Sequence, residues 1–242
     1  MAEAEGASLT GLVSAVLAAL RHDGDVLGPA VRVCQACVAL LPVDGAAISV
    51  MADTQNRQSL YASDAVAERL EDVQFSLGEG PCFEAFGTGQ PVLAPDLAHD
   101  AAPAWPVFAA QVDTAEVGAI FAFPLRRGAA HVGAIDLYRR TAGWLSDAEV
   151  ATALRIADIA TSALLASAAG ADGEIDEVWL TALTRNRAVV HQATGVVIAE
   201  FGIGPEQALA RLRGYAFTTG RLLDDVAVDL VAGRLHPREI ES

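Results

Sequence analysis

The sequence predicts an α+β protein in which a mixed helix-and-sheet part is followed by a small all-helical part. Between residues 45 and 138, short apolar runs are separated by turns that contain glycine, proline and polar residues, a pattern typical of strands. From residue 177 onward, apolar residues recur at helical spacing and leave no room for a strand. We therefore expect an N-terminal helical segment at 1–24, a mixed domain at 25–168, a linker of small residues at 169–174, and a helical domain at 175–242.

The composition excludes a membrane protein and a disulfide-rich scaffold. The 242 residues are 52% hydrophobic, enough to bury one large core or two modest ones. No span reaches the roughly 20 apolar residues that a membrane helix needs, and the apolar stretch at 9–20 follows acidic residues instead of a basic region. Three cysteines do not suggest a disulfide framework. We expect a cytoplasmic protein with no membrane partner.

The charge pattern excludes a generally basic nucleic-acid-binding protein. The net charge is -15, and all 16 basic residues are arginines. Residues 1–173 hold 9 arginines and 21 acidic residues, whereas the rest holds 7 and 10. The helical part is therefore not the basic module that usually marks nucleic-acid binding. If it binds RNA, a local cluster of arginines must do so.

The mixed domain should contain two helices, a sheet with helices inserted between its strands, and a long closing helix. A hairpin is expected early in the sheet, and glycine and proline at 78–81 should start a helix that carries Cys82 in its first turn. In order, we expect helices at 8–21 and up to 41, strands at 45–51 and 59–63, a helix at 66–70, the Cys82 helix, a strand at 91–94, a helix at 105–112, strands at 117–125 and 131–138, and a helix at 145–167.

The last part should form three helices around one small core. A first helix is expected at about 177–201, and Gly204-Pro205 should end the turn after it and start the second. The third carries an apolar stripe from Leu223 to Val231 and should end near Gly233.

These helices resemble the ANTAR family, the antiterminator domain of bacterial regulators. The resemblance covers about sixty residues and rests on RAVVHQATGVVI at 187–198, EQALARLRGYA at 206–216 and LLDDVA at 222–227. Thr194 stands where the family usually has a lysine. The resemblance implies a protein that binds paired stem-loops in nascent mRNA and prevents a terminator hairpin from forming.

The mixed domain resembles a GAF domain, in the version that actinobacterial proteins carry ahead of ANTAR. The motifs are GEGPC at 78–82, PVL at 91–93 and VGAIDLY at 132–138, within about 130 residues. The resemblance implies a sensor with a small-molecule pocket between the sheet and its inserted helices. No ligand or cofactor can be named from these residues, but the possible lining is Tyr61, Phe75, Cys82, Trp105, Phe108 and Phe121, which would otherwise simply fill the core.

Arginine pairs with phosphates through two hydrogen bonds and stacks on unpaired bases, so it suits recognition of RNA loops. Scattered arginines on an acidic domain are also typical of an ordinary solvated surface. Gly195 lies mid-helix, where glycine costs about 1 kcal/mol relative to alanine. Such a glycine suits a place where another helix or a nucleic-acid backbone comes close, and the alternative is a glycine that is merely tolerated. The candidate RNA-binding residues are Arg185, Arg187, His191, Gln192, Thr194, Arg211, Arg213, Tyr215 and Arg221.

Cys82 supports an alternative function. A thiol in the first turn of a helix tends to have a lowered pKa and to be reactive, and some GAF relatives are cysteine-dependent methionine sulfoxide reductases. The nearby Phe83 and Phe86 favour a buried thiol instead. Cys34 and Cys37 lack the further ligands of a metal site and are expected to be core residues.

The main prediction is a regulator without catalytic residues that binds RNA as a homodimer. Its sensor would shift an existing equilibrium that controls the two ANTAR domains. A further alternative is a helical tail that binds protein instead of RNA.

Overall fold

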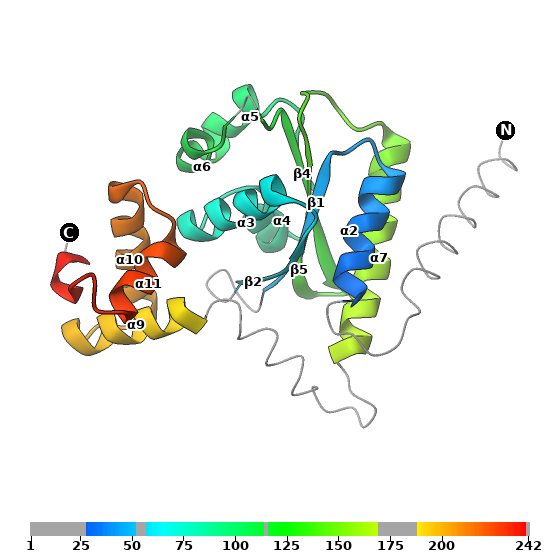
Figure 1. Ribbon diagram of the computed structural model, residues 1–242. Helices are drawn as coiled ribbons and strands as arrows, with labels where there is room; N and C mark the ends of the chain where they lie inside the picture. Colours follow the sequence, from blue (N-terminus) through cyan, green and yellow to red (C-terminus); the bar gives the residue numbers. More distant parts are fainter. Residues whose placement is uncertain (1–27, 52–56, 114–115, 169–187, 241–242) are drawn as a thin grey trace, which may run out of the picture.

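The computed structural model describes residues 28–51, 57–113, 116–168 and 188–240 (Figure 1). The helix expected at 8–21, the linker expected at 169–174, Arg185 and Arg187 all lie outside these ranges. The described chain forms a sheet covered by helices on both faces, followed by a separate group of helices at the C-terminal end. This confirms the predicted α+β fold. None of the helices in the described ranges has the length and apolarity needed to cross a bilayer.

The sheet has five antiparallel strands in the order β2-β1-β5-β4-β3. The hairpin expected early in the domain is present, since the first two strands pair directly. The last two strands in the sequence form a long hairpin, and they occupy the fourth and the central positions of the sheet. The strands are β1 (Gly45–Met51), β2 (Arg57–Ala62), β3 (Val92–Ala94), β4 (Ala119–Arg127) and β5 (Ala130–Arg139).

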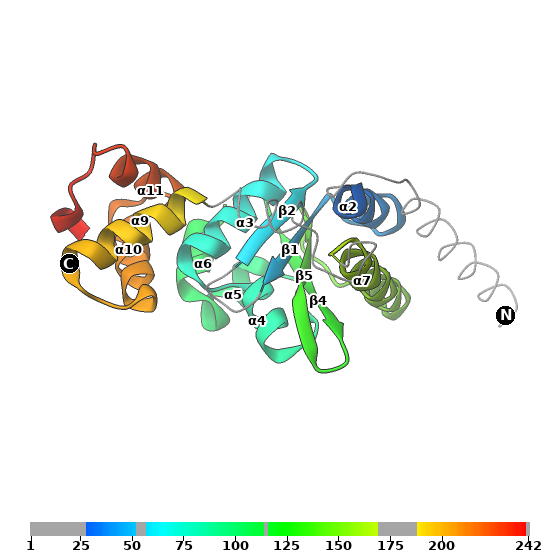
Figure 2. The same ribbon diagram turned by 90° about the horizontal axis from the view of Figure 1, so that it is seen from below.

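Among the described residues, two helices cover one face of the sheet and four helices cover the other (Figure 2). The first layer is α2 (Gly28–Leu40) and α7 (Asp147–Ala168), which pack on the sheet through Val33, Ile156 and Leu164. The second layer comprises α3 (Ala65–Leu77), α4 (Pro81–Thr88), α5 (Leu97–Ala104) and α6 (Pro106–Gln111).

The register assigns alternate residues of each strand to opposite faces. Ile48 pairs with Ile135, and both belong to the core beneath α2 and α7. Ala47 pairs with Asp136, and these residues face the second layer, next to α3. Because both faces are covered, a polar residue on the second face is buried.

The C-terminal domain consists of α9 (Ala188–Phe201), α10 (Pro205–Thr219) and α11 (Leu223–Val231), followed by the short 3-10 helix η1 (Pro237–Ile240). Pro205 occupies the first helical position of α10, and Gly220 ends it in a left-handed conformation with φ 64°. Val197, Leu212, Val226 and their neighbours form one buried core. The three expected helices are therefore confirmed within the described residues.

Two helices of the mixed domain differ from the prediction. The helix expected at 66–70 extends to Leu77. It ends there because Gly78 adopts a left-handed conformation with a φ of 70°. Asp64 caps its start by accepting hydrogen bonds from the N–H groups of Val66 and Ala67. The second difference is α5, which was not predicted because its eight residues, LAHDAAPA, show no apolar periodicity.

Candidate functional site

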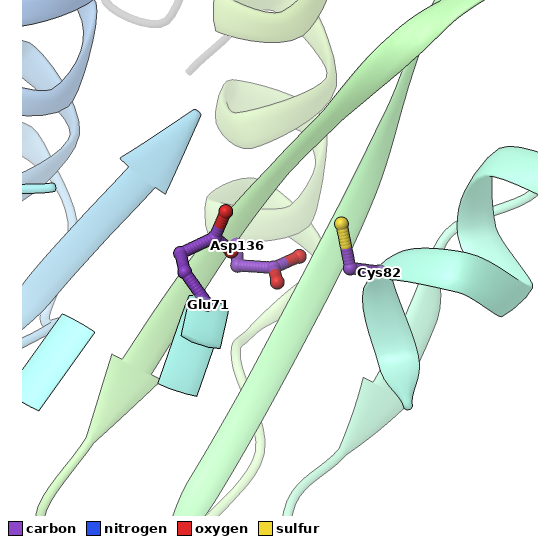
Figure 3. A group of neighbouring side chains, drawn as sticks. All are labelled: Glu71, Cys82 and Asp136. Atoms are coloured by element: carbon purple, nitrogen blue, oxygen red, sulfur yellow. The ribbon is translucent and has the colours of Figure 1, made fainter. Parts of the chain in front are cut away.

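A buried polar cluster lies between the sheet and the helices α3 and α4. The strands supply Ser49 from β1, Arg57 from β2 and Asp136 from β5, and all three are buried. The helices supply Glu71 and Gln74 from α3 and Cys82 from the start of α4, also buried. Figure 3 shows Glu71, Asp136 and Cys82 brought together from three different elements.

An ion pair neutralises one side of this cluster. Arg57 Nη2 lies 2.5 Å from Glu71 Oε2, and these side chains are 1% and 2% exposed. Arg57 Nη1 donates a hydrogen bond of 3.0 Å to the backbone oxygen of Glu71, and the Ser49 hydroxyl donates to the Glu71 carboxylate. The guanidinium also lies 5.3 Å from the centre of the Phe83 ring. Glu71 Oε2 therefore contacts both the Arg57 guanidinium and the Ser49 hydroxyl within the protein interior.

Gln74 connects Asp136 and Cys82, the other two residues shown in Figure 3. Its Nε2 donates a hydrogen bond of 2.6 Å to Asp136 Oδ2. Its Oε1 accepts one of 2.8 Å from the backbone N–H of Cys82. This N–H lies in the first turn of α4, where no partner within the helix is available. One amide therefore joins α3 to both β5 and α4.

Burial sets the protonation states of the cluster. It raises the pKa of Asp136 to about 8, with the negative Glu71 adding to the shift. Burial also raises the pKa of the Cys82 thiol well above its usual value, and the positive Arg57 offsets this only in part. The expected lowering by the start of the helix is overcome by desolvation. The Cys82 thiol is thus protonated at neutral pH and unsuited to nucleophilic attack.

The donor atoms of Glu71, Cys82 and Asp136 all lie within 4.8 Å of one another, a spacing at which they could hold a metal ion. Arg57, however, already supplies a positive charge beside Glu71. Burial also raises the pKa of Asp136 to about 8, and a protonated carboxyl group is a poor metal ligand, so these residues favour the internal ion pair over an ion.

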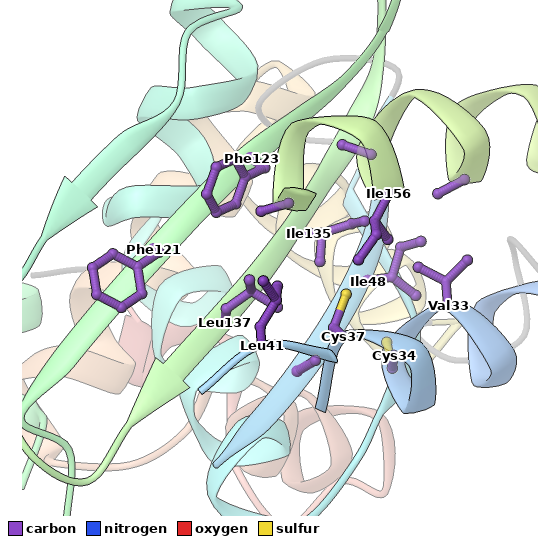
Figure 4. Close-up of a cluster of buried hydrophobic side chains, with 14 of the residues drawn as sticks. Val33, Cys34, Cys37, Leu41, Ile48, Phe121, Phe123, Ile135, Leu137 and Ile156 are labelled. Carbon is purple, nitrogen blue, oxygen red and sulfur yellow. The ribbon is translucent and has the colours of Figure 1, made fainter. Parts of the chain in front are cut away.

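The six residues proposed to line a ligand pocket do not share one. Trp105 and Phe108 pack edge to face, with 6.4 Å between their ring centres, in the core beneath the second layer of helices. Phe121 lies on the opposite face of the sheet, in the same core as Leu137 and Leu41 (Figure 4), because strand residues alternate and its neighbour Ile120 faces α3. Tyr61 packs at the edge of that same opposite core.

Two more of the six residues belong to other clusters. Cys82 packs with Met51, Phe86 and Ala134. Phe75 is buried in the core of the C-terminal domain, so its expected place beside the sheet was wrong. The cavity beside Gln74, Asp136 and Tyr138 measures about 10 Å³. This is room for roughly one water, far below the roughly 300 Å³ of a small-ligand site.

On the C-terminal domain, α9 exposes one face. His191, Gln192, Gly195 and Ala199 are all exposed, at the spacing of successive turns, while Val190, Ala193 and Val197 face the core. Thr194 is half-buried, and its hydroxyl donates 2.7 Å to the oxygen of Val190 in the same helix.

The three described arginines of the predicted set have separate neighbours. Arg211 lies 4.6 Å above the ring of Phe201 at the end of α9. Arg213, two positions on and so on the other side of α10, lies 5.6 Å above Phe75. Arg221 Nη2 pairs at 2.5 Å with Asp229, which also binds Arg234 at 2.6 Å.

The structure therefore does not gather the predicted RNA-binding residues at one point. His191 and Phe201 are ten residues apart on α9, which corresponds to about 15 Å along the helix axis. Arg211 accordingly lies at the opposite end of α9 from His191. Tyr215 is half-buried against the core of the domain.

No sequence pattern indicated a role for Ser49, Arg57, Glu71, Gln74 or Asp136. One signal was present: Asp136 interrupts an otherwise apolar strand, and a carboxylate that is buried with such a strand needs partners. The identity of those partners depends on strand register and helix packing, which the local pattern does not provide.

Comparison with known proteins identifies both domains. A model of the GAF domain matches residues 30–165, more than half of the chain, and a model of the ANTAR domain matches residues 180–231. No curated protein matches significantly.

The first domain is similar to several solved structures. The GAF domain of an Acinetobacter phosphoenolpyruvate-protein phosphotransferase is 13% identical, with a TM-score of 0.53, over 70% of this chain and 98% of that one. The GAF domain of a Coxiella burnetii phosphoenolpyruvate-protein phosphotransferase is 11% identical, with a TM-score of 0.52, over 65% and 93%. A free methionine-R-sulfoxide reductase from Neisseria meningitidis is 14% identical, with a TM-score of 0.45, over 63% and 85%. The chain belongs to the GAF domain family and carries an ANTAR domain after it, which is the architecture of a GAF-ANTAR regulator.

Proposed function

We propose that this protein is a signal-responsive regulator in the cytoplasm that binds paired stem-loops in nascent mRNA and promotes transcription antitermination. The ANTAR match supports RNA as the partner. We place the division into domains at 25–168 and 175–242, with the sensor first. The exposed face of α9, together with Arg211, Arg213 and Arg221, would contact the RNA, and Arg185 and Arg187 would extend this surface.

Gly195 is the observation that carries the proposal. It lies in the middle of the exposed face of α9, and a Cβ added there would meet nothing within 4 Å. Glycine at such a position costs about 1 kcal/mol relative to alanine. No internal neighbour requires the missing side chain, so the open position leaves room for an RNA backbone to approach α9 closely.

Recognition of unpaired bases would matter more than attraction to the phosphate backbone. The protein carries a net charge of -15, and Asp229 offsets the charges of both Arg221 and Arg234. Stacking by arginine and hydrogen bonds from His191 and Gln192 suit bases displayed in a loop. We expect a shallower salt dependence than that of a basic RNA-binding domain.

The test compares two exposed-glycine variants in the full chain. RNA that binds the protein would first be selected from a library of tandem hairpins. Gly195→Ala should stabilise α9 and weaken binding to the selected RNA by tenfold or more, because the methyl group meets the RNA. Gly87→Ala is the control, since Gly87 is exposed on α4 of the sensor and a Cβ there also meets nothing within 4 Å. Failure to enrich any hairpin would contradict the proposed function. Equal affinity of both variants and wild type would contradict the assignment of the α9 face.

We further propose a homodimer that presents two ANTAR domains to two stem-loops. The outer layer of the sensor leaves Val38, Leu40 and Leu154 exposed by 37%, 40% and 38%. These side chains lie on α2 and α7, the layer farthest from the C-terminal helices (Figure 1). Sedimentation equilibrium tests this proposal: Leu40→Glu should convert the dimer into a monomer, and a wild-type protein that is already monomeric at micromolar concentration would contradict it.

A further inference from the structure

The end of α3 belongs to the sensor by sequence but packs into the ANTAR domain. Phe75 is 3% exposed and lies in the same buried cluster as Leu212 and Leu223. In the opposite direction, Leu222 packs against the sensor core that contains Phe108. The contact therefore interlocks apolar side chains of both domains, and Figure 1 shows α3 reaching from the sheet toward α10 and α11.

One hydrogen bond fixes the position of this contact. The backbone N–H of Leu223, the first residue of α11, donates 3.0 Å to the Ser76 hydroxyl, and this bond is buried. The N-cap residue of α11 is Leu222, whose side chain accepts no hydrogen bond. The sensor therefore supplies the side-chain cap that the ANTAR helix lacks.

The same contact occupies Arg213, one of the residues proposed to bind RNA. Its guanidinium lies 5.6 Å above the Phe75 ring. It also lies against the left-handed turn that ends α3, since a Cβ at Gly78 would come within 2.8 Å of Arg213 Nη1. Arginine recognises an unpaired base with the flat face of its guanidinium, and the aromatic ring occupies one such face here.

The same turns of α3 also hold part of the buried polar cluster of the sensor. Gln74, adjacent to Phe75, bonds Asp136 and the backbone of Cys82, and Glu71 one turn earlier pairs with Arg57. A shift of the last turn of α3 cannot occur without altering these hydrogen bonds. The helix therefore connects the interior of the sensor with the ANTAR domain through direct contacts.

We propose that the end of α3 is a docking surface for the ANTAR domain of the same chain, and that docking competes with RNA for Arg213. This inference rests on the proposed RNA-binding function. RNA binds the undocked form, and a signal that rearranges the polar cluster around Gln74 releases the domain. The apparent affinity for RNA is then reduced by the fraction of molecules that are docked.

The test uses full-length protein and the tandem-hairpin RNA selected with the wild type. Ser76→Ala removes the cap from α11 and leaves every proposed RNA contact in place. The loss of one buried hydrogen bond should favour the undocked form and tighten RNA binding roughly fivefold. Phe75→Ala should tighten binding further. Ser146→Ala is the matched control, because its hydroxyl caps α7 in the sensor, away from the ANTAR domain.

Hydrogen exchange gives a second readout that does not depend on a variant. When RNA is added to the wild type, the amides around Ser76 and Leu223 should exchange faster, because binding opens the contact. Circular dichroism first establishes that each variant is folded, and if Phe75→Ala is not, Ser76→Ala decides. Suppose that the wild type binds RNA, that Ser76→Ala binds it with unchanged affinity, and that RNA does not speed exchange at Leu223. These results would overturn docking and leave the proposed function intact. Absence of RNA binding in every form, undocked variants included, overturns the proposed function and with it this competition.

Discussion

Gln74 and Phe75 are consecutive residues of α3 whose side chains enter the cores of two different domains. Gln74 donates to Asp136 and accepts from the backbone of Cys82 in the sensor, whereas Phe75 is buried with the apolar residues of the ANTAR domain. Successive residues of a helix differ by about 100° in direction, so one turn can serve both neighbours. This places the polar interior of the sensor one residue away from the domain that it would regulate.

The buried carboxyl group of Asp136 should make stability depend on pH. Its pKa of about 8 lies above the value near 3.9 of an unfolded chain. Between these values the folded state retains a proton that the unfolded state loses, so this contribution to stability is complete below about pH 4 and is lost as the pH rises through 8. Asp136→Asn stays neutral and keeps an oxygen that can accept from Gln74.

Urea unfolding at pH 5 and pH 8 measures this effect. The wild type should lose more stability over this interval than Asp136→Asn, because only the wild type has the titrating group. Asp158→Asn, on the exposed side of α7, is the control for removing one negative charge. Equal pH dependence of wild type and Asp136→Asn would show that Asp136 is ionised in the folded protein.

The ion pair between Arg57 and Glu71 should be costly to break from one side. Glu71→Gln leaves a buried guanidinium without its counter-charge, and the expected loss of stability is about 3 to 5 kcal/mol. Replacing both residues, as in Arg57→Met with Glu71→Leu, should recover most of this loss because no buried charge remains. Denaturant midpoints of the single and double variants test this, and additive losses would contradict a direct pair.

Local patterns predicted most of the elements but not the polar cluster. Alternation and helical spacing identified β1, β5, α7 and the three ANTAR helices, because each pattern lies within one segment. Ser49 and Asp136 are separated by 87 positions and approach only through the pairing of β1 with β5. Phe75 illustrates the same limit, since helical spacing indicates that it faces a core without indicating which domain provides it.

The three thiols should be unreactive in the folded protein. Cys34, Cys37 and Cys82 are at most 1% exposed, and burial raises the pKa of each thiol. Cys34 and Cys37 also lie in the core beneath α2, on the face of the sheet opposite Cys82, so neither is placed to resolve an oxidised Cys82.

Peptide mapping after a short iodoacetamide treatment at pH 8 should find no modified cysteine in native protein. All three should be modified in guanidinium chloride, which serves as the control. Rapid alkylation of Cys82 in native protein would contradict its buried, protonated state and would favour the thiol enzyme.

Asp229 should limit the affinity of the ANTAR domain for RNA. Its carboxylate pairs with Arg221 at 2.5 Å and with Arg234 at 2.6 Å, and the hydrogen bonds from Arg234 and Arg221 lower its pKa, so it stays ionised at neutral pH. Asp229→Asn keeps the shape of the side chain and removes its charge. Both guanidinium groups then become available to phosphates, and RNA should bind several-fold more tightly with a steeper dependence on salt.

Asp225→Asn, exposed on the same helix, is the control for net charge alone. Equal gains in the two variants would assign the effect to overall charge, and unchanged binding in Asp229→Asn would place the RNA away from Arg221 and Arg234.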